Sequence, residues 1–211
     1  MDASVNQPIQ VNNRFRWAAI IMMATFLGLA WMSYSQEAVV DASQIADLPE
    51  GPLAGYQAIE FTLPTLEGET FSLSEYRGQP VILNFWASWC GPCLAELPLL
   101  ERTAIFYRGR VTILGINNGE SIRTVEQFAQ EHDLSFPLLL DDNYLVGDQY
   151  LVTALPTTFF IDQYGVIQEV FTGILNEGIL QDRIEALLNA EVNRGQSSIT
   201  SNPRTPLAIR N

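Results

Sequence analysis

The chain has 211 residues, 47% of them hydrophobic and 17% charged, which is enough for one well-buried domain with appended tails and excludes two large domains. A formal net charge of −13 excludes the basic face that nucleic-acid binding needs, so no nucleic acid is expected as a partner. All 11 basic residues are arginine, which excludes lysine chemistry such as Schiff-base formation, and two cysteines with one histidine cannot build a closed four-ligand zinc site.

The first predicted element is a transmembrane anchor at residues 17–36, a run of 20 residues without an acidic or basic side chain. As a helix this run would extend about 30 Å, which matches the hydrocarbon core of a bilayer. Arg14 and Arg16 precede the run, and four acidic residues follow it between positions 37 and 50. The positive-inside rule therefore predicts that residues 1–16 are cytoplasmic and that the rest of the chain lies on the outer side of the cell membrane.

A cleaved secretory signal is the alternative interpretation of the same segment. Ser33 and Ser35 are small residues placed where a peptidase would cut before Gln36. The apolar run is longer than the roughly 7 to 15 residues of a usual signal core, and Trp17 and Tyr34 near its ends suit interfacial anchoring, so the uncleaved anchor is favoured. Both interpretations export the domain.

Two further segments lack the pattern of a packed core. Residues 37–57 show no sustained periodicity and contain two prolines and two glycines, which predicts a tether. Residues 191–211 have too little apolar content to pack, which predicts a disordered C-terminal tail. The folded domain is therefore expected at residues 58–190.

Within this domain, short β-rich apolar runs alternate with amphipathic segments, which is typical of an α/β domain with a mixed central sheet flanked by helices. Residues 163–165 (QYG) predict a tight hairpin turn, Asp162 is expected to cap it, and Asn176 is expected to cap the last helix. The expected strands are 59–63, 70–73, 81–86, 111–116, 136–140, 157–162 and 166–171, and the expected helices are 90–107, 121–132, 144–151 and 176–188.

Cys90 and Cys93 stand three residues apart, where the strand at 81–86 gives way to the helix at 90–107. At a helix N-terminus, unpaired amides and the macrodipole favour the thiolate of the first cysteine. The second cysteine faces the same side of the helix, where it can close a short disulfide or resolve a mixed one. The spacing therefore predicts a redox pair, with Cys90 as the attacking thiol and Cys93 as the resolving thiol, in preference to a purely structural disulfide.

Residues 85–93 (FWASWCGPC) closely resemble the active-site segment of thioredoxin, and residues 154–158 (ALPTT) resemble the second signature of that family. The resemblance implies a thioredoxin-like fold. It also implies a cis proline that faces the cysteines and leaves room for an extended substrate segment beside them. The substrate-binding residues expected on this basis are Trp89, Gly91, Pro92, Leu155 and Pro156.

Residues 61–73 (FTLPTLEGETFSL) and an insert at 119–151 resemble the membrane-tethered TlpA, ResA and CcmG group. This resemblance implies a thioredoxin-like domain with an N-terminal strand extension and a central insert, preceded by one transmembrane helix. Proteins of that group reduce disulfides in exported proteins, commonly apocytochrome c or copper-site assembly proteins, and a membrane protein of the CcdA or DsbD kind usually recharges them. The same partners are implied for this chain, with no cofactor beyond the Cys90–Cys93 pair.

Two residues near the pair bear on mechanism. Asn84 stands where thioredoxin has a buried aspartate that assists deprotonation, so that route is absent here. Glu96 matches a carboxylate found near the dithiol in ResA-like proteins, and its position three residues after Cys93 places it where it can take or hold the proton of that thiol. A solvent-exposed helix charge is the alternative interpretation of Glu96.

The residues between and before the cysteines indicate the direction of exchange. Gly91 and Pro92 form the dipeptide found in thioredoxin, whereas strongly oxidising relatives carry a histidine there that stabilises the reduced thiolate. Reduction of substrates is therefore the expected direction. Trp86 and Trp89 either line the substrate groove or, as the simpler account, pack beside the cysteines.

Two other functions fit parts of the pattern. The opening strands and the insert also resemble a peroxiredoxin, but a peroxidase usually has a threonine three residues before its reactive cysteine, where this chain has Ala87. A chaperone or copper-handling adaptor would use Cys90 and Cys93 as soft Cu(I) ligands. Retention of metal after purification under reducing conditions would distinguish the second function.

Overall fold

The computed structural model describes residues 17, 18, 20–27 and 47–199. The chain divides into two units, one up to residue 39 and one from residue 40 onward. In the first unit the described residues are helical, and their large apolar side chains are exposed. No helix among the described residues is both long and apolar enough to cross a membrane.

Several predicted segments fall partly or wholly outside the described residues. These are the cytoplasmic segment 1–16, residues 19 and 28–36 of the predicted anchor, residues 37–46 of the predicted tether and residues 200–211 of the predicted tail. The predictions made for them stay predictions.

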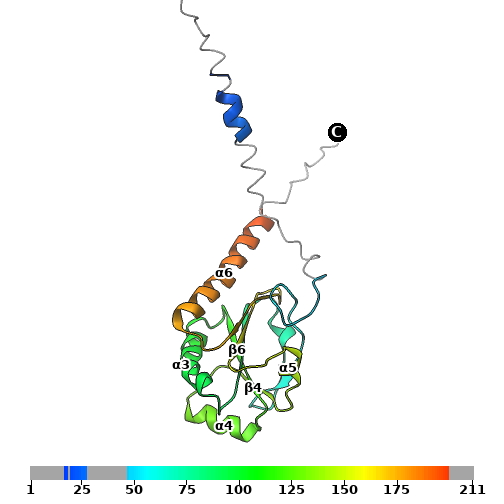
Figure 1. Ribbon diagram of the computed structural model, residues 1–211, viewed down its shortest axis with the longest axis vertical. Helices are drawn as coiled ribbons and strands as arrows, with labels where there is room; N and C mark the ends of the chain where they lie inside the picture. Colours follow the sequence, from blue (N-terminus) through cyan, green and yellow to red (C-terminus); the bar gives the residue numbers. More distant parts are fainter. Residues whose placement is uncertain (1–16, 19, 28–46, 200–211) are drawn as a thin grey trace, which may run out of the picture. The chain divides into compact units, whose positions relative to one another are not determined.

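A five-stranded mixed sheet forms the centre of the second unit, with the strand order β5-β4-β3-β6-β7 (Figure 1). Strands β3 (Val81–Trp86), β4 (Thr112–Asn118) and β5 (Leu138–Asp141) run parallel to one another. Strand β6 (Thr157–Ile161) is antiparallel to β3, and β7 (Ile167–Thr172) is antiparallel to β6. The predicted mixed sheet is therefore confirmed.

Strand β3 lies in the middle of this sheet, and all six of its residues are buried. Ile82 and Trp86 belong to the hydrophobic core on one face of the sheet, while Leu83 and Phe85 belong to the core on the other. Because both faces are covered, five of the six residues are apolar, with Asn84 as the one polar residue, and the strand shows no polar and apolar alternation.

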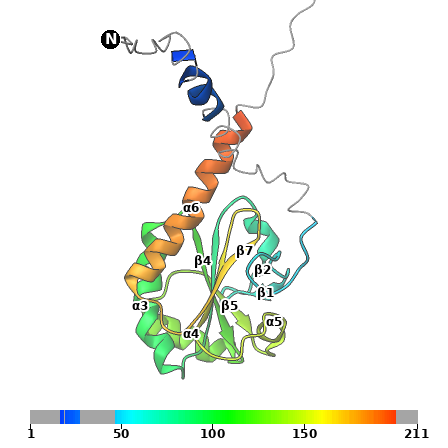
Figure 2. The same ribbon diagram turned by 45° about the horizontal axis from the view of Figure 1, so that its top comes forward.

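Helices cover one face of the sheet, and a hairpin with a short helix covers the other (Figure 2). The first face packs against α3 (Gly91–Phe106), α4 (Ile122–Glu131) and α6 (Glu177–Ile199). The second face packs against α5 (Leu145–Gln149) and against the N-terminal hairpin, which lies within residues 61–73. The insert predicted at residues 119–151 therefore forms α4, β5 and α5, and all three elements are part of the domain.

The N-terminal hairpin consists of β1 (Thr62–Pro64) and β2 (Thr70–Ser72), and the 3-10 helix η1 (Leu73–Tyr76) follows it. The prediction that the first strand begins at residue 59 was wrong, because the backbone before β1 is bonded to other parts of the domain. The amide of Ala58 donates to the carbonyl of Gly165 at 2.8 Å, and the carbonyl of Ile59 accepts the Tyr150 hydroxyl at 2.6 Å.

Replacing Tyr150 with phenylalanine is expected to lower the free energy of unfolding by about 1 to 3 kcal/mol, because it removes the hydrogen bond between the buried Tyr150 side chain and the carbonyl of the half-buried Ile59. Urea unfolding of both proteins measures the difference. Tyr144→Phe is the matched control, since that ring is 47% exposed, and it should change the free energy of unfolding by less than about 0.5 kcal/mol. Equal losses in the two variants would contradict the role given to the Tyr150 hydroxyl.

Two predicted boundaries are corrected. Part of the predicted tether is folded onto the domain, because Gly55 donates to the carbonyl of Ile167 at 2.7 Å and Gln57 forms a β-bridge with Val166. The tail was predicted to be disordered from residue 191, but α6 continues to Ile199. No proline interrupts the sequence after the start of α6 until Pro203, so nothing in the chain forces the helix to end at residue 188.

The predicted turn and caps are present. Gly165 donates to the carbonyl of Asp162 at 2.9 Å and has a φ of +81°, a left-handed conformation that glycine adopts without strain. The Asp162 carboxylate accepts the amide of Val166 at 3.0 Å. The Asn176 side chain accepts the amide of Ile179 at 2.9 Å, which satisfies a free N–H in the first turn of α6.

Candidate active site

Strand β3 and helix α3 place the two cysteines at their junction. Cys90 is the N-cap of α3, and its sulfur accepts the backbone amide of Cys93 at 3.2 Å. The two residues form a disulfide with a Cα–Cα distance of 5.2 Å. A sulfur in this position faces free amides and the positive end of the helix dipole, so the structure supplies the environment that favours a thiolate at Cys90 after reduction.

The two cysteines differ in accessibility. Cys90 is 5% exposed and lines an open groove, whereas Cys93 is fully buried and does not line it. A protein substrate can therefore approach the sulfur of Cys90 before that of Cys93.

The groove beside Cys90 has a volume of about 510 Å³ and brings together residues from four parts of the chain. Trp89, Gly91 and Pro92 lie next to Cys90 in sequence, and Leu155 comes from the loop before β6. Four predicted substrate-binding residues therefore lie at one groove. The other lining residues are Asn118, Tyr144, Val152, Thr153 and Ala154.

Pro156 is the fifth predicted substrate-binding residue. Its peptide bond with Leu155 is cis, as the resemblance to thioredoxin implied, and its side chain is buried. Leu155 stands at the groove wall, directly before this bond.

The two tryptophans have different surroundings. Trp86 is completely buried in the core, so the packing interpretation is right for this residue. Trp89 is 70% exposed and lines the groove, so the packing interpretation is wrong for it. Trp86 is the last residue of β3, which is buried on both faces, whereas Trp89 lies in the loop after this strand.

None of the ten residues that line the groove is charged, although the chain carries a net charge of −13. Tyr144 contributes to this uncharged wall and was not predicted from the sequence. Its ring lies so close to Gly119 that a Cβ atom built there would be 1.9 Å from the ring, and Gly119 itself has a φ of +84°. No local pattern could have identified Tyr144, since 50 residues or more separate it from the cysteines.

Glu96 lies on α3, one turn after Cys93, and only 1% of it is exposed. The prediction that it might be a solvent-exposed helix charge was therefore wrong. Its carboxylate accepts the Asn84 side-chain amide at 2.8 Å and the backbone amide of Leu175 at 2.8 Å. Burial raises the pKa of the Glu96 carboxyl above its ordinary value, and the hydrogen bonds from Leu175 and Asn84 lower it in part.

Asn84 connects this carboxylate to the sheet. Its side-chain nitrogen also donates to the hydroxyl of Thr158 on β6 at 2.9 Å, and both residues are fully buried. The side-chain oxygen of Asn84 has no hydrogen-bond partner among the described residues. Asn84 thus stands where thioredoxin has an aspartate, and its side-chain amide binds the carboxylate of Glu96.

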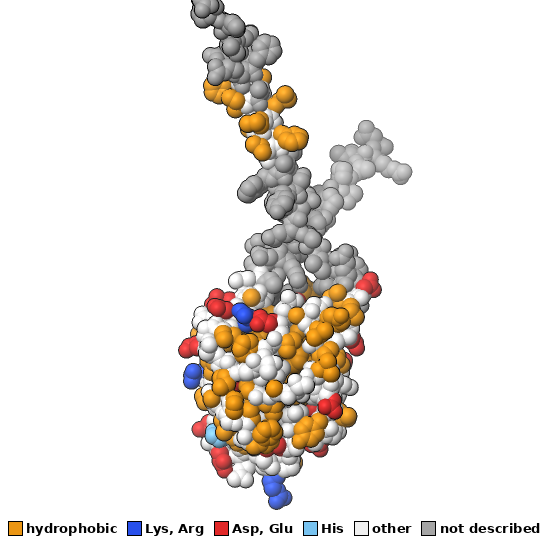
Figure 3. Space-filling view, viewed as in Figure 1, with side chains coloured by type: hydrophobic (Ala, Val, Ile, Leu, Met, Phe, Trp, Pro, Cys, Tyr) orange, Lys and Arg blue, Asp and Glu red, His pale blue; other side chains and the backbone are white. Residues whose placement is uncertain are grey.

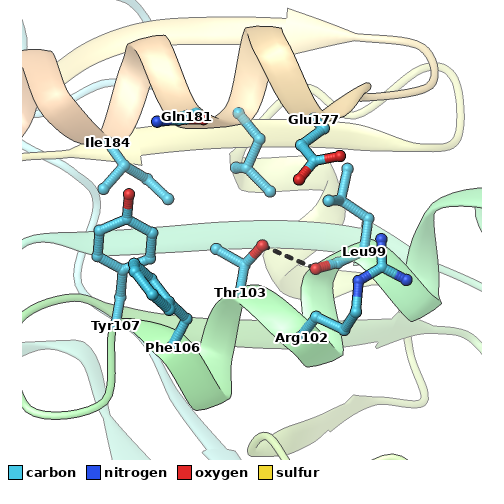
Figure 4. A pocket seen from close by; sticks show the side chains of 9 residues that line it. Leu99, Arg102, Thr103, Phe106, Tyr107, Glu177, Gln181 and Ile184 are labelled. Carbon is cyan, nitrogen blue, oxygen red and sulfur yellow. Dashed lines mark hydrogen bonds between the residues drawn. The ribbon is translucent and has the colours of Figure 1, made fainter.

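A second groove of about 300 Å³ lies between α3 and α6 (Figure 4). Thr103 on α3 donates its hydroxyl to the carbonyl of Leu99 at 2.7 Å, and Glu177 and Gln181 stand on the opposite helix. None of the residues lining this groove is a cysteine or a predicted site residue. The redox chemistry is therefore assigned to the groove at Cys90.

Comparisons with known proteins agree with this arrangement. A sequence profile of the AhpC/TSA family matches residues 54–170, more than half of the chain. The chain is 32% identical over 177 residues to the thioredoxin-like protein YneN of Bacillus subtilis (strain 168), and the match covers 81% of this chain and 97% of YneN. It is 39% identical over 134 residues to the thiol-disulfide oxidoreductase ResA of Geobacillus thermodenitrificans (strain NG80-2), covering 63% of this chain and 77% of that protein.

A solved structure supports the same fold. The putative thiol:disulfide interchange protein DsbE from Chlorobium tepidum matches with a TM-score of 0.60 at 28% sequence identity, covering 64% of this chain and 97% of that one. The fold is thus thioredoxin-like, with a Cys90–Cys93 pair at the N-terminus of α3. The chain belongs to the AhpC/TSA family, and within it to the thioredoxin-like thiol-disulfide oxidoreductases of the ResA type.

Proposed function

We propose that this protein is a membrane-anchored, extracytoplasmic reductase that transfers two electrons from Cys90 and Cys93 to disulfides of other exported proteins. The observation that carries the proposal is the position of Cys90 in an open, uncharged groove, next to the buried pair of Cys93 and Glu96. Exposed apolar side chains at and near the groove, among them Trp89 at 70% and Leu151 at 67%, suit a protein segment as substrate better than a small polar one.

The first step forms a mixed disulfide. The Cys90 thiolate attacks one sulfur of the substrate disulfide, a new S–S bond forms, and the second substrate sulfur leaves as a thiolate that takes up a proton. The groove wall around Leu155 and Trp89 holds the substrate segment so that its disulfide lies against the sulfur of Cys90.

The second step releases the reduced substrate. Cys93 gives its proton to Glu96, and the resulting thiolate attacks the sulfur of Cys90. The Cys90–Cys93 disulfide forms as the bond between Cys90 and the substrate breaks, and the released substrate thiolate takes up a proton, such as the one held by Glu96, so that both substrate sulfurs are thiols. A carboxylate whose pKa is raised by burial is a better base near neutral pH than an ordinary glutamate, which supports Glu96 as the proton acceptor.

The substrate class follows from the resemblance to the TlpA, ResA and CcmG group. We propose apocytochrome c or a copper-site assembly protein as substrate, and a CcdA- or DsbD-like membrane protein as the electron donor that restores the two thiols. The relative from Geobacillus thermodenitrificans is named a thiol-disulfide oxidoreductase, which is consistent with this chemistry. The net charge of −13 supports protein partners over nucleic acid, and on the face drawn in Figure 3 the basic side chains of the described residues lie in separate small spots and not in one basic patch.

A membrane-impermeant maleimide tests location and direction together. The chain contains only two cysteines, so every modification of the protein reports on Cys90 or Cys93. In cells stripped of their wall but with an intact membrane, we expect the reagent to modify Cys90 without added reductant, because the domain lies outside and is kept reduced, and because Cys90 lines the groove whereas Cys93 is buried.

Two other results would contradict the proposal in different ways. Modification only after the membrane is broken would place the domain in the cytoplasm. Modification only after a reductant has been added would show an oxidised resting pair, which fits an oxidase and contradicts a reductase. A variant with both cysteines replaced by serine provides the background.

A further inference from the structure

The segment that joins β3 to Cys90 is held by a side chain from the loop after β4. The amide of Cys90 donates to the carbonyl of Ala87 at 3.2 Å, which makes a tight turn over this segment. Ser88, in the middle of the turn, donates twice to the carboxylate of Glu120: its amide at 2.7 Å and its hydroxyl at 2.5 Å. Both carboxylate oxygens of Glu120 are thus engaged two residues before the attacking sulfur.

Glu120 is itself held by hydrogen bonds to Asn117 on β4, the strand next to β3. The side-chain amide of Asn117 donates to one of its carboxylate oxygens at 2.7 Å, and the Glu120 backbone amide donates to the Asn117 side-chain oxygen at 3.3 Å. Asn117 is fully buried in β4. Between the two residues the chain turns through Gly119, whose amide donates to the carbonyl of Asp141 on β5 at 2.9 Å. The carboxylate is therefore anchored to β4 and β5 before it reaches Ser88.

We propose that Glu120 is a positioning residue for Cys90, which holds the 87–89 segment and thereby favours the disulfide over the dithiol. Two physical effects act in the same direction. Reduction frees the Cys90 sulfur, and a restrained segment gains less conformational freedom on reduction than a loose one does. The Glu120 carboxylate is held at Ser88, two residues before Cys90. This fixed negative charge opposes a second one nearby, and so disfavours the Cys90 thiolate.

The domain contains a matched arrangement that serves as a control. Glu101, on α3, accepts the amide of Ser135 at 2.7 Å and also the hydroxyl of Ser135. Both glutamates are half-buried, and each holds one serine through two hydrogen bonds. Ser135 lies in the loop before β5, whereas Ser88 precedes Cys90, so the two contacts differ in their relation to the dithiol.

The test is the equilibrium of the full chain with reduced and oxidised dithiothreitol at pH 7, where two electrons pass from dithiothreitol to the Cys90–Cys93 disulfide. We expect Glu120→Gln to raise the equilibrium constant for reduction by about threefold to tenfold, because the amide can satisfy only one of the Ser88 donors and carries no charge. Ser88→Ala keeps the charge and the backbone hydrogen bond, and should shift the constant in the same direction by a smaller factor. Glu101→Gln should leave it at the wild-type value.

The thermal midpoints of the same variants separate positioning from general stability. We expect Glu120→Gln and Glu101→Gln to lower the midpoint by similar amounts, while only the first changes the redox equilibrium. An unchanged equilibrium in Glu120→Gln, or an equal shift in Glu101→Gln, would overturn the proposal. Should Glu120→Gln fail to fold, Ser88→Ala decides: a wild-type equilibrium constant in that variant would equally overturn it.

Discussion

We expect Cys90→Ser to abolish disulfide exchange, and Cys93→Ser to give a protein that forms mixed disulfides but does not release them. The reason is the unequal position of the two sulfurs: Cys90 caps α3 and lines the groove, whereas Cys93 is fully buried behind it. The first variant lacks the attacking thiolate, and the second lacks the thiol that breaks the mixed disulfide. Insulin reduction measures turnover, and non-reducing gels of acid-quenched, alkylated samples measure the trapped species.

The double serine variant gives the zero baseline, because no other cysteine is present in the chain. Trapping of equal amounts of substrate by the two single variants would contradict the assignment of separate roles. So would residual turnover in Cys90→Ser, since it would show that Cys93 can be reached by substrate.

Glu96→Gln should slow the release of substrate from the mixed disulfide by about 10² or more, as expected when a general base is lost. The effect should be largest near neutral pH. It should shrink toward pH 5, because the Glu96 carboxyl, whose pKa is raised by burial, becomes protonated there and can no longer accept a proton, and toward pH 9, where thiols ionise without help. In the reduced wild type the titrations of Glu96 and Cys93 should be coupled, because a carboxylate near a thiol raises the pKa of that thiol, whereas the variant should show a simple thiol titration. Stopped-flow reduction of an apocytochrome peptide between pH 5 and 9 measures both.

The stability of the same variant provides the internal control. Burial raises the pKa of Glu96 in the folded protein above its value in the unfolded chain, so the protonated carboxyl is favoured by folding. Its contribution to the free energy of unfolding is fully present below the unfolded pKa and is lost as the pH rises through the folded pKa. Urea unfolding should therefore show that wild type loses stability relative to Glu96→Gln between pH 4 and pH 8.

Glu101→Gln is the matched control for the rate, since Glu101 lies on the same helix and is only half-buried. It should reduce substrates at the wild-type rate. Superimposable pH profiles for wild type and Glu96→Gln would remove Glu96 from the mechanism and leave it as a structural link between α3 and the loop before α6.

The sequence was sufficient to predict the core of the domain, because local patterns carry that information. Strand β3 is apolar apart from Asn84, and α4 has its apolar residues on one face, so both were found within one or two residues of their ends. The cysteine pair followed from a spacing of three residues at a strand-to-helix junction. The cis bond at Pro156 came from a resemblance to thioredoxin and not from any local pattern.

Features that depend on contacts between distant segments were not predictable from the sequence. The helical spacing placed Glu96 beside Cys93, but only the amide of Leu175, 79 residues away, shows that the carboxylate is enclosed. The same holds for Tyr144 in the groove and for the hold of Glu120 on Ser88, which joins residues 32 positions apart. These contacts exist because β3 and β4 are neighbours in the sheet and because the insert folds beside them.

Covalent trapping on Cys93→Ser in its native membrane tests the central claim most directly. The variant is purified after rapid alkylation of free thiols, and the attached proteins are identified by mass spectrometry before and after reduction. We expect exported proteins, each attached to Cys90 through one member of a cysteine pair, and none attached in a control that also carries Cys90→Ser. Attachment of cytoplasmic proteins only, or of no protein at all, would contradict an exported disulfide reductase.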